Sequence, residues 1–283
     1  MPPAARRSRQ AAGGMTSCPE RTAGEFRFRV FLPRLLPRLL HRRQERDSPQ
    51  RMFDISPDIA KNISRVAVAF VPMLLGIVLH EVAHGYAAYK LGDPTAKLQG
   101  RLTLNPVKHL DTTGSLLFVI TALFSPFILG WAKPVPVQPR YFKNPRKGMM
   151  LISFAGPGTN FALALAFGAL YAVLIRSLLG GGLELTSTTR FFLTSTFMGI
   201  WVNVTLGWFN LLPIPSLDGG HILAGLLPME LARKFYSLGR YGLIILVVLL
   251  GTGLLRYVMG PLVINTIGVI GTLFSIPPKL LFM

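Results

Sequence analysis

The sequence predicts an all-α polytopic membrane protein with about five to six membrane segments and a short β-hairpin or re-entrant element after the first helix. Three observations lead to this prediction. Of the 283 residues, 51% are hydrophobic and only 15% are charged, whereas a soluble domain carries about a quarter charged residues. Several apolar runs are long enough to cross a bilayer as helices. Many of the basic residues lie in short loops beside these runs, as the positive-inside rule expects.

The formal net charge of +18 does not indicate a protein that binds nucleic acid. Residues 1–51 hold twelve arginines against four acidic residues, so this stretch accounts for +8 of the total. The remainder clusters in loops next to apolar segments, which is typical of contact with a lipid bilayer. The single cysteine, Cys18, lies in the same stretch. The chain therefore has no intramolecular disulfide framework.

Residues 1–51 are predicted to be separate from the rest of the chain. Their one apolar patch, residues 31–40, is interrupted by proline and arginine and is too short to span a bilayer. The stretch also lacks the unbroken apolar core of a secretory signal. Two interpretations stay open: a disordered basic tail, or a natural protein that begins at Met52 and lacks the tail. We expect residues 52–283 to form one membrane-embedded domain.

The first membrane helix is predicted from about Ile63 to Lys90, and it carries His80, Glu81 and His84. Two histidines four residues apart lie on one face of a helix, about one turn from each other. This spacing lets both imidazoles hold one Zn²⁺, while Glu81 can act on a water molecule as a general base. Ionisable groups inside an apolar helix are costly in lipid, so their presence indicates a function.

The segment that follows alternates apolar and polar residues over 97–104. This period predicts a short strand or hairpin at the membrane surface. His109 follows, beside Lys108 and Asp111. We interpret His109 as a surface or hydrogen-bonding histidine and not as a third metal ligand.

Residues 115–131 form an apolar segment of about 17 residues, which is marginal for a crossing, and Pro126 and Gly130 interrupt it. The loops on both sides of it, 90–113 and 133–148, are basic, so both prefer the cytoplasm. They can share a side only if the segment between them enters the membrane and returns. A re-entrant segment is therefore favoured over a full crossing.

A long membrane helix is predicted from Met149 to Ile175, and near its start lie Gly156, Pro157 and Asn160. Small residues at this point let another backbone approach closely. Asn160 places an amide within the apolar layer. It serves either to pack helices together or as a hydrogen-bond donor that faces the site.

The next crossing, Phe191 to Leu212, ends in a broken stretch that contains Pro213 and precedes Asp218. Irregular backbone at membrane depth is tolerated mainly where it lines a cavity or is packed in protein. Asp218 fits two compatible roles, as the N-cap of the next helix and as a carboxylate ligand. Two further apolar segments, 241–259 and 261–277, complete the chain.

Two motifs in this order carry a resemblance to a known family. His80-Glu81-Val82-Ala83-His84 in one membrane helix, followed by Asn210, Pro213 and Asp218-Gly219 after a later one, resembles the site-2 protease family of intramembrane zinc metalloproteases. Gly156, Pro157 and Asn160 match a further element of that family. The resemblance covers about residues 60–235 and is closest in kind to small bacterial members without PDZ or CBS modules.

The resemblance implies a metal site and a catalytic residue. His80, His84 and Asp218 would be the ligands of one Zn²⁺ per chain, which leaves a fourth position for water. Glu81 would take a proton from that water and pass it to the leaving amine. Among the remaining motif residues, those expected to support the site or the substrate are Asn160, Asn210, Pro213 and Gly219. His221 is expected to be a bystander or to lie behind the ligands.

The implied function is that of an intramembrane zinc metalloendopeptidase, which cleaves a peptide bond within or near the transmembrane helix of another membrane protein. The resemblance to small bacterial members implies that this protein lies in the bacterial inner membrane. The charge rule places the active site toward the cytoplasm, with loops 90–113, 133–148 and 213–240 inside and 176–190 outside. Residues 1–51 would then lie outside, against the rule.

Two other functions compete with proteolysis at this stage. A polytopic carrier could use the buried histidines and Asp218 to relay metal or protons, but such proteins often contain internal repeats and none is evident in this sequence. A non-proteolytic protein that binds membrane helices is the second alternative. Glu81 disfavours it, because a pure binder needs no base beside the metal ligands.

Overall fold

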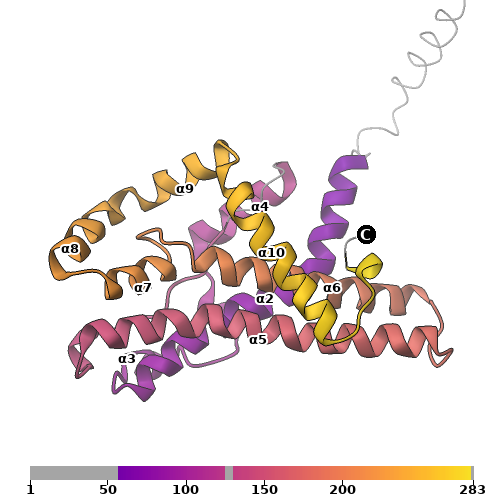
Figure 1. The fold of residues 1–283 in the computed structure, drawn as a ribbon, viewed down its shortest axis with the longest axis horizontal. Helices are drawn as coiled ribbons and strands as arrows, with labels where there is room; N and C mark the ends of the chain where they lie inside the picture. Colours follow the sequence, from indigo (N-terminus) through magenta and orange to yellow (C-terminus); the bar gives the residue numbers. More distant parts are fainter. Residues whose placement is uncertain (1–56, 125–129, 282–283) are drawn as a thin grey trace, which may run out of the picture. The chain divides into compact units, whose positions relative to one another are not determined.

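Three long helices form the centre of the fold: α2 (Pro57–Lys90), α5 (Pro145–Leu179) and α6 (Ser187–Asn210). The computed structural model describes residues 57–124 and 130–281. Each of the three helices packs against the other two (Figure 1). Helix α2 begins earlier than predicted and ends at Lys90 as predicted. Gly92 follows it with a φ of +105°, a conformation that favours glycine.

Within the described residues, five helical stretches are long and apolar enough to cross a membrane. They are Ala67–Lys90, Pro145–Leu179, Ser187–Asn210, Met229–Gly251 and Leu254–Leu273. This result confirms the prediction of a helical membrane protein with about five to six membrane segments. Residues 1–51 lie outside the described residues, so both interpretations of that stretch stay predictions.

The fourth stretch consists of α8 (Met229–Ser237), a 3₁₀ turn (Leu238–Tyr241) and α9 (Gly242–Gly251). The fifth is α10 (Leu254–Leu273). The prediction that the last two apolar segments are separated near residue 260 is wrong, because the helices are separated at residues 252–253. Gly253 takes a φ of +72° at the start of α10, which ends one helix and begins the next, whereas Pro261 is accommodated inside α10.

The predicted strand or hairpin over residues 97–104 is also wrong, because the described residues contain no strand in this region. Thr95–Leu98 forms the short helix α3, Gly100 turns the chain with a φ of +63°, and Pro106–His109 forms a 3₁₀ turn. The leucines that gave the alternation do not line one buried face. Leu98 is 80% exposed, while Arg101 is 5% exposed.

Helix α4 (Thr112–Phe124) begins the apolar segment after this turn, and residues 125–129 lie outside the described part of the chain. The two ends of the segment meet. Leu110 pairs with Ala132 in an isolated antiparallel bridge, and the Lys133 backbone N–H donates to the His109 carbonyl over 2.8 Å. The His109 side chain is buried and bonds to the Thr103 carbonyl, so the surface interpretation of this residue is wrong and the hydrogen-bonding interpretation is confirmed.

Helix α7 (Asp218–Leu226) packs along α5 (Figure 1). Two glycines in its first turn let the helix begin close against the segment that precedes it. A Cβ atom on Gly219 would overlap the Leu211 backbone, and one on Gly220 would overlap the Ile214 carbonyl. The N-cap of α7 is Leu217, with no side-chain cap. The capping role predicted for Asp218 is therefore wrong, and its carboxylate is turned elsewhere.

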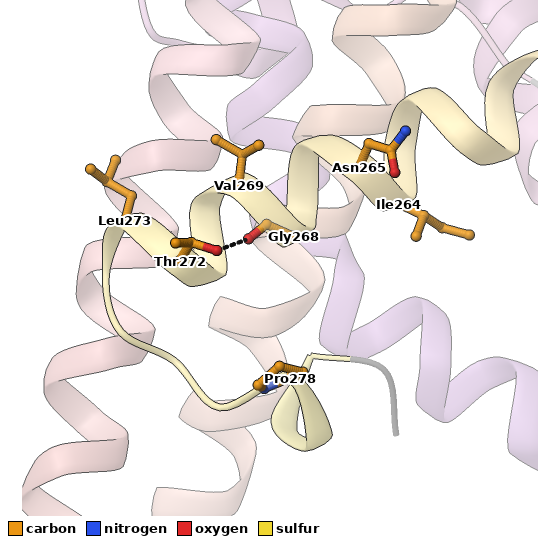
Figure 2. Close-up of a pocket in the computed structure, with 7 residues that line it drawn as sticks. All are labelled: Ile264, Asn265, Gly268, Val269, Thr272, Leu273 and Pro278. Carbon is orange, nitrogen blue, oxygen red and sulfur yellow. Dashed lines mark hydrogen bonds between the residues drawn. The ribbon is translucent and has the colours of Figure 1, made fainter.

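The main apolar core is formed by α5, α6 and α10. Its fully buried members include Ala164, Ile200, Val204 and Ile267. On another part of α10 and the segment after it lies an open cavity, shown in Figure 2. None of the residues that line this cavity is a predicted site residue. The lining residues are Ile264, Asn265, Gly268, Val269, Thr272, Leu273 and Pro278.

Candidate metal centre

Three side chains that the sequence singled out as ligands converge on one point. His80 Nε2 and His84 Nε2, both from α2, lie 2.9 Å apart. Asp218 Oδ2, from α7, lies 3.2 Å from the first nitrogen and 3.3 Å from the second. Ligand atoms about 2.0–2.2 Å from a tetrahedral zinc would lie about 3.3–3.5 Å from one another. The spacing of this group therefore suits a single small metal ion.

The other ring nitrogen of each histidine is occupied by an acceptor. His80 Nδ1 lies 2.6 Å from Asn160 Oδ1, and His84 Nδ1 lies 2.7 Å from the Ile152 backbone carbonyl. Because the carbonyl and amide oxygens can only accept, both Nδ1 atoms must carry the proton. In the neutral rings, both Nε2 atoms then present lone pairs toward Asp218. This is the arrangement that metal-binding histidines adopt.

Asp218 Oδ2 is buried and receives no hydrogen bond, although two nitrogens lie close to it. Three electron-rich atoms thus face one another without a proton to share, in a site between helices. Such a group is unfavourable unless a cation lies among it. Two imidazole nitrogens and one carboxylate oxygen are a ligand set of catalytic zinc sites, which keep a fourth position open. The residues present fit zinc.

Gly156 closes the site from the side of α5. A Cβ atom at this position would lie 2.5 Å from His84 Nε2 and 2.6 Å from His80 Cε1. Only glycine leaves the imidazoles room in this arrangement. The element that begins with Gly156 therefore contributes to the metal centre through the absence of a side chain, and the following turn contributes Asn160.

Glu81 lies beside the ligands on α2, partly buried, and its carboxylate is held by the backbone. The Val135 N–H donates to Glu81 Oε2 over 3.0 Å. Val135 is itself buried and lies in an extended stretch between two prolines. Since neither proline has an N–H group, the N–H of Val135 stands between two positions that cannot donate.

Buried polar groups hold both ends of this extended stretch. The Arg101 guanidinium donates to the Lys133 carbonyl over 2.5 Å. At the other end, Asp93 accepts from the Gln138 backbone N–H over 2.6 Å and from the hydroxyl and backbone N–H of Thr95. Burial alone would raise the pKa of Asp93, but these hydrogen bonds and the charge of Arg140 outweigh it and lower the pKa below its usual value.

Of the other predicted site residues, Asn160 contacts a proposed ligand, whereas the contacts of Asn210 and Gly219 are elsewhere. Asn160 is fully buried and faces His80 through its oxygen, not through the donor that the sequence analysis considered. Asn210 ends α6, and its amide donates to the Leu206 carbonyl of the same helix. Pro213 is exposed. Gly219 positions α7 as described above.

Two further histidines stay away from the group of three ligands. His221 Nδ1 lies 3.3 Å from the Leu217 carbonyl, and its ring lies beside Tyr236. His109 Nε2 lies 2.9 Å from the Thr103 carbonyl. Neither belongs to the cluster of possible metal ligands found among the described residues.

Sequence reasoning missed Asn203 of α6, which is fully buried and bonded to Asn160. A polar residue inside an apolar crossing is a signal that could have identified it. It also missed the contact between Glu81 and Val135, since a backbone N–H has no signature in the sequence.

Comparisons with known proteins identify one family of peptidases. The family model described as Peptidase family M50 matches residues 68–250. Matching relatives carry names that begin "Putative zinc metalloprotease", and two of them are YwhC and Rip2. YwhC of Bacillus subtilis is 40% identical over 202 residues, which are 71% of this chain and 87% of YwhC. Rip2 of Mycolicibacterium smegmatis is 32% identical over 203 residues, which are 70% of this chain and 73% of Rip2. No solved structure shows a significant match.

Proposed function

Because the chain belongs to peptidase family M50, the site-2 protease family, and is a zinc-dependent protease of the membrane, we propose that it cleaves a peptide bond within or near the transmembrane helix of another membrane protein. His80, His84 and Asp218 hold the zinc, and Glu81 is the catalytic base. The observation that carries this proposal is the convergence of three possible ligand atoms within 3.3 Å of one another.

When bound there, zinc would polarise the scissile carbonyl and acidify a water molecule. The Glu81 carboxylate accepts the proton that this water loses as it attacks, and then delivers it to the leaving amine nitrogen. The Val135 N–H fixes one carboxylate oxygen, which leaves the other free to receive the proton. Asn160 and the Ile152 carbonyl hold the two imidazoles in the ligating tautomer.

The position of the site supports a substrate that is itself a membrane helix. His80, Glu81 and His84 lie in the second half of Ala67–Lys90, an apolar stretch that can cross the membrane, so a peptide bond must enter that depth to reach them. The backbone carbonyls of an intact helix are hydrogen-bonded within the helix. The substrate helix must therefore unwind locally before its peptide bond can meet Glu81 and the metal.

The same proposal includes a topology. The ends of the segment that contains α4 meet at the Leu110–Ala132 bridge, and α4 itself is too short to cross a bilayer. These facts support a re-entrant segment with both basic flanks on one side. We place that side, and the active site, toward the cytoplasm of a bacterial inner membrane, because the positive-inside rule assigns basic loops to the cytoplasm.

The test uses the full chain purified in detergent and loaded with zinc. One substrate is a membrane protein with a single transmembrane helix, and the other is an unfolded soluble protein. Mass spectrometry of the new termini should place the cuts in or next to the transmembrane helix, and a chelator should abolish them. Cleavage of the soluble protein alone, or no cleavage by the zinc-loaded chain, would contradict the proposal.

A further inference from the structure

Two buried asparagines join the metal centre to the helix behind it. Asn160 on α5 and Asn203 on α6 are both fully buried, and Asn160 Nδ2 donates to Asn203 Oδ1 over 3.1 Å. Amide groups inside apolar helices are costly unless their hydrogen bonds are made. The pair lies between α2, α5 and α6, the three helices that form the centre of the fold.

Two backbone carbonyls fix the orientation of both amides. Asn160 Nδ2 lies 3.2 Å from the Gly76 carbonyl, and Asn203 Nδ2 lies 2.9 Å from the Gly199 carbonyl. A carbonyl can only accept, so each amide must turn its nitrogen to it. The oxygen of Asn203 then faces Asn160, and the oxygen of Asn160 faces His80. All hydrogen bonds in the series therefore run in one direction.

The direction of this series decides where His80 carries its proton. Since Asn160 presents an oxygen, His80 Nδ1 must donate, and His80 Nε2 keeps its lone pair toward Asp218. A reversed Asn160 amide would present N–H groups to His80 Nδ1 and would favour the tautomer with its proton at the metal position. The orientation of one buried amide thus controls whether His80 is a ligand.

We propose that Asn203 is a positioning residue of the metal centre, which fixes the Asn160 amide together with the Gly76 carbonyl and thereby holds His80 in the zinc-binding tautomer. The inference rests on the proposed assignment of His80 as a zinc ligand. It assigns a role to a residue that lies behind the ligands and outside both sequence motifs. Asn203 acts through Asn160 and does not touch the substrate or the metal.

The space around Gly76 provides a second, independent support. A Cβ atom on Gly76 would lie 2.5 Å from Asn203 Oδ1 and 3.4 Å from Asn160 Nδ2. The glycine on α2 therefore lets Asn203 reach its partner, one turn before His80.

A double-mutant cycle separates positioning from simple packing. Asn203→Leu is made alone and together with Asn160→Asp. A carboxyl group at position 160 has an oxygen on both sides, so it presents an acceptor to His80 in either orientation. Its second oxygen faces the Gly76 carbonyl and Asn203 Oδ1, which are both acceptors, so in this background Asn203→Leu removes a repulsion and not a hydrogen bond that orients residue 160. Zinc affinity is measured by competition with a chelator, and the visible absorption of the Co²⁺-loaded protein reports the ligand set. Asn265→Leu, at an exposed position in the cavity of Figure 2, is the control for the same change away from the metal centre.

We expect Asn203→Leu alone to weaken zinc binding about 10–100-fold, the range for outer-shell partners of metal ligands, and to alter the Co²⁺ spectrum. In the Asn160→Asp background, Asn203→Leu should weaken zinc binding less than about threefold, because the orientation of residue 160 then no longer decides whether His80 meets an acceptor. An equal loss in both backgrounds would overturn the proposal and make Asn203 a packing residue. If the leucine variant does not fold, Asn203→Ala removes the same amide without added bulk and decides the outcome.

The readout also separates this inference from the proposed substrate. Zinc affinity and the Co²⁺ spectrum are measured without any protein substrate. A chain that fails to cut transmembrane helices but shows the expected coupling would contradict the proposed function alone. A chain that cuts them but shows no coupling would contradict the role of Asn203 alone.

Discussion

Asp218 Oδ2 lies 3.2 Å from His80 Nε2, although the two residues come from α7 and α2 and are far apart in the sequence. No hydrogen bond reaches this oxygen. The pair therefore has the geometry of two ligands of one ion and not that of a helix cap.

The first prediction concerns this third ligand. Asp218→Ala removes one of three protein ligands, so zinc binding should weaken by more than about 100-fold, beyond the loss caused by outer-shell changes. Asp218→Asn should fall between, because an amide oxygen ligates less well than a carboxylate. Chelator competition followed by metal analysis measures both. Unchanged zinc content in the alanine variant would remove Asp218 from the site.

The second prediction concerns the glycine that closes the site. Gly156→Ala would place a methyl group 2.5 Å from His84 Nε2, so zinc binding and proteolysis should both be lost while the chain still inserts in the membrane. Gly158→Ala is the matched control on the same helix, because its Cβ would meet only the Phe154 ring at 3.7 Å. Equal behaviour of the two variants would show that the imidazoles move aside without cost.

The third prediction concerns pH and Asp93, which anchors the extended stretch beside Glu81. Its pKa is lowered in the folded chain, so its ionised form stabilises the fold above the unfolded pKa of about 3.9. That stability is lost as the pH falls through the folded pKa. Asp93→Asn cannot accept all three hydrogen bonds and should lower the thermal unfolding midpoint by several degrees at pH 7.

Metal-free protein at a series of pH values provides the measurement for Asp93. The difference between wild type and Asp93→Asn should persist from pH 7 to about pH 5 and shrink below the unfolded pKa of about 3.9. Glu184→Gln, on the exposed loop before α6, should show no such difference. A difference that is constant down to the lowest pH would mean that the Asp93 charge does not contribute.

The fourth prediction concerns topology. In a Cys18→Ser background, which removes the single native cysteine, Gln99→Cys and Gln138→Cys should both react with a membrane-impermeant reagent from the cytoplasmic side. Glu184→Cys should react only from the opposite side. Labelling of positions 99 and 138 from opposite faces would make the segment between them a full crossing and would contradict the re-entrant arrangement.

The parts of the site that depend on local geometry could be predicted from the sequence. His80, Glu81 and His84 lie within one helix, where the residue spacing alone sets which side chains share a face. Asp218 could be proposed from the broken backbone before it either as a helix cap or as a ligand, and the family resemblance added that it would share one zinc with the histidines. Its approach to the histidines depends on how α7 packs on α5, which no local pattern encodes.

The errors have equally physical causes. Residues 97–104 alternate like a strand, but Leu98 is exposed and Arg101 is buried against the Lys133 carbonyl, so burial does not follow the alternation. The break before α10 depends on the left-handed backbone of Gly253, which composition alone did not distinguish from the Gly260-Pro261 pair. Asn203 was not singled out, although an amide within an apolar crossing indicates a function.

The measurement that tests the account most directly compares wild type with Glu81→Gln in two assays on the same purified protein. The glutamine keeps the size of Glu81 but cannot take a proton, so the variant should retain about one zinc per chain and lose transmembrane proteolysis by a factor of about 10²–10⁴ or more. Cleavage at a near wild-type rate by the zinc-loaded variant would contradict the assignment of Glu81 as the base and, with it, the central mechanism.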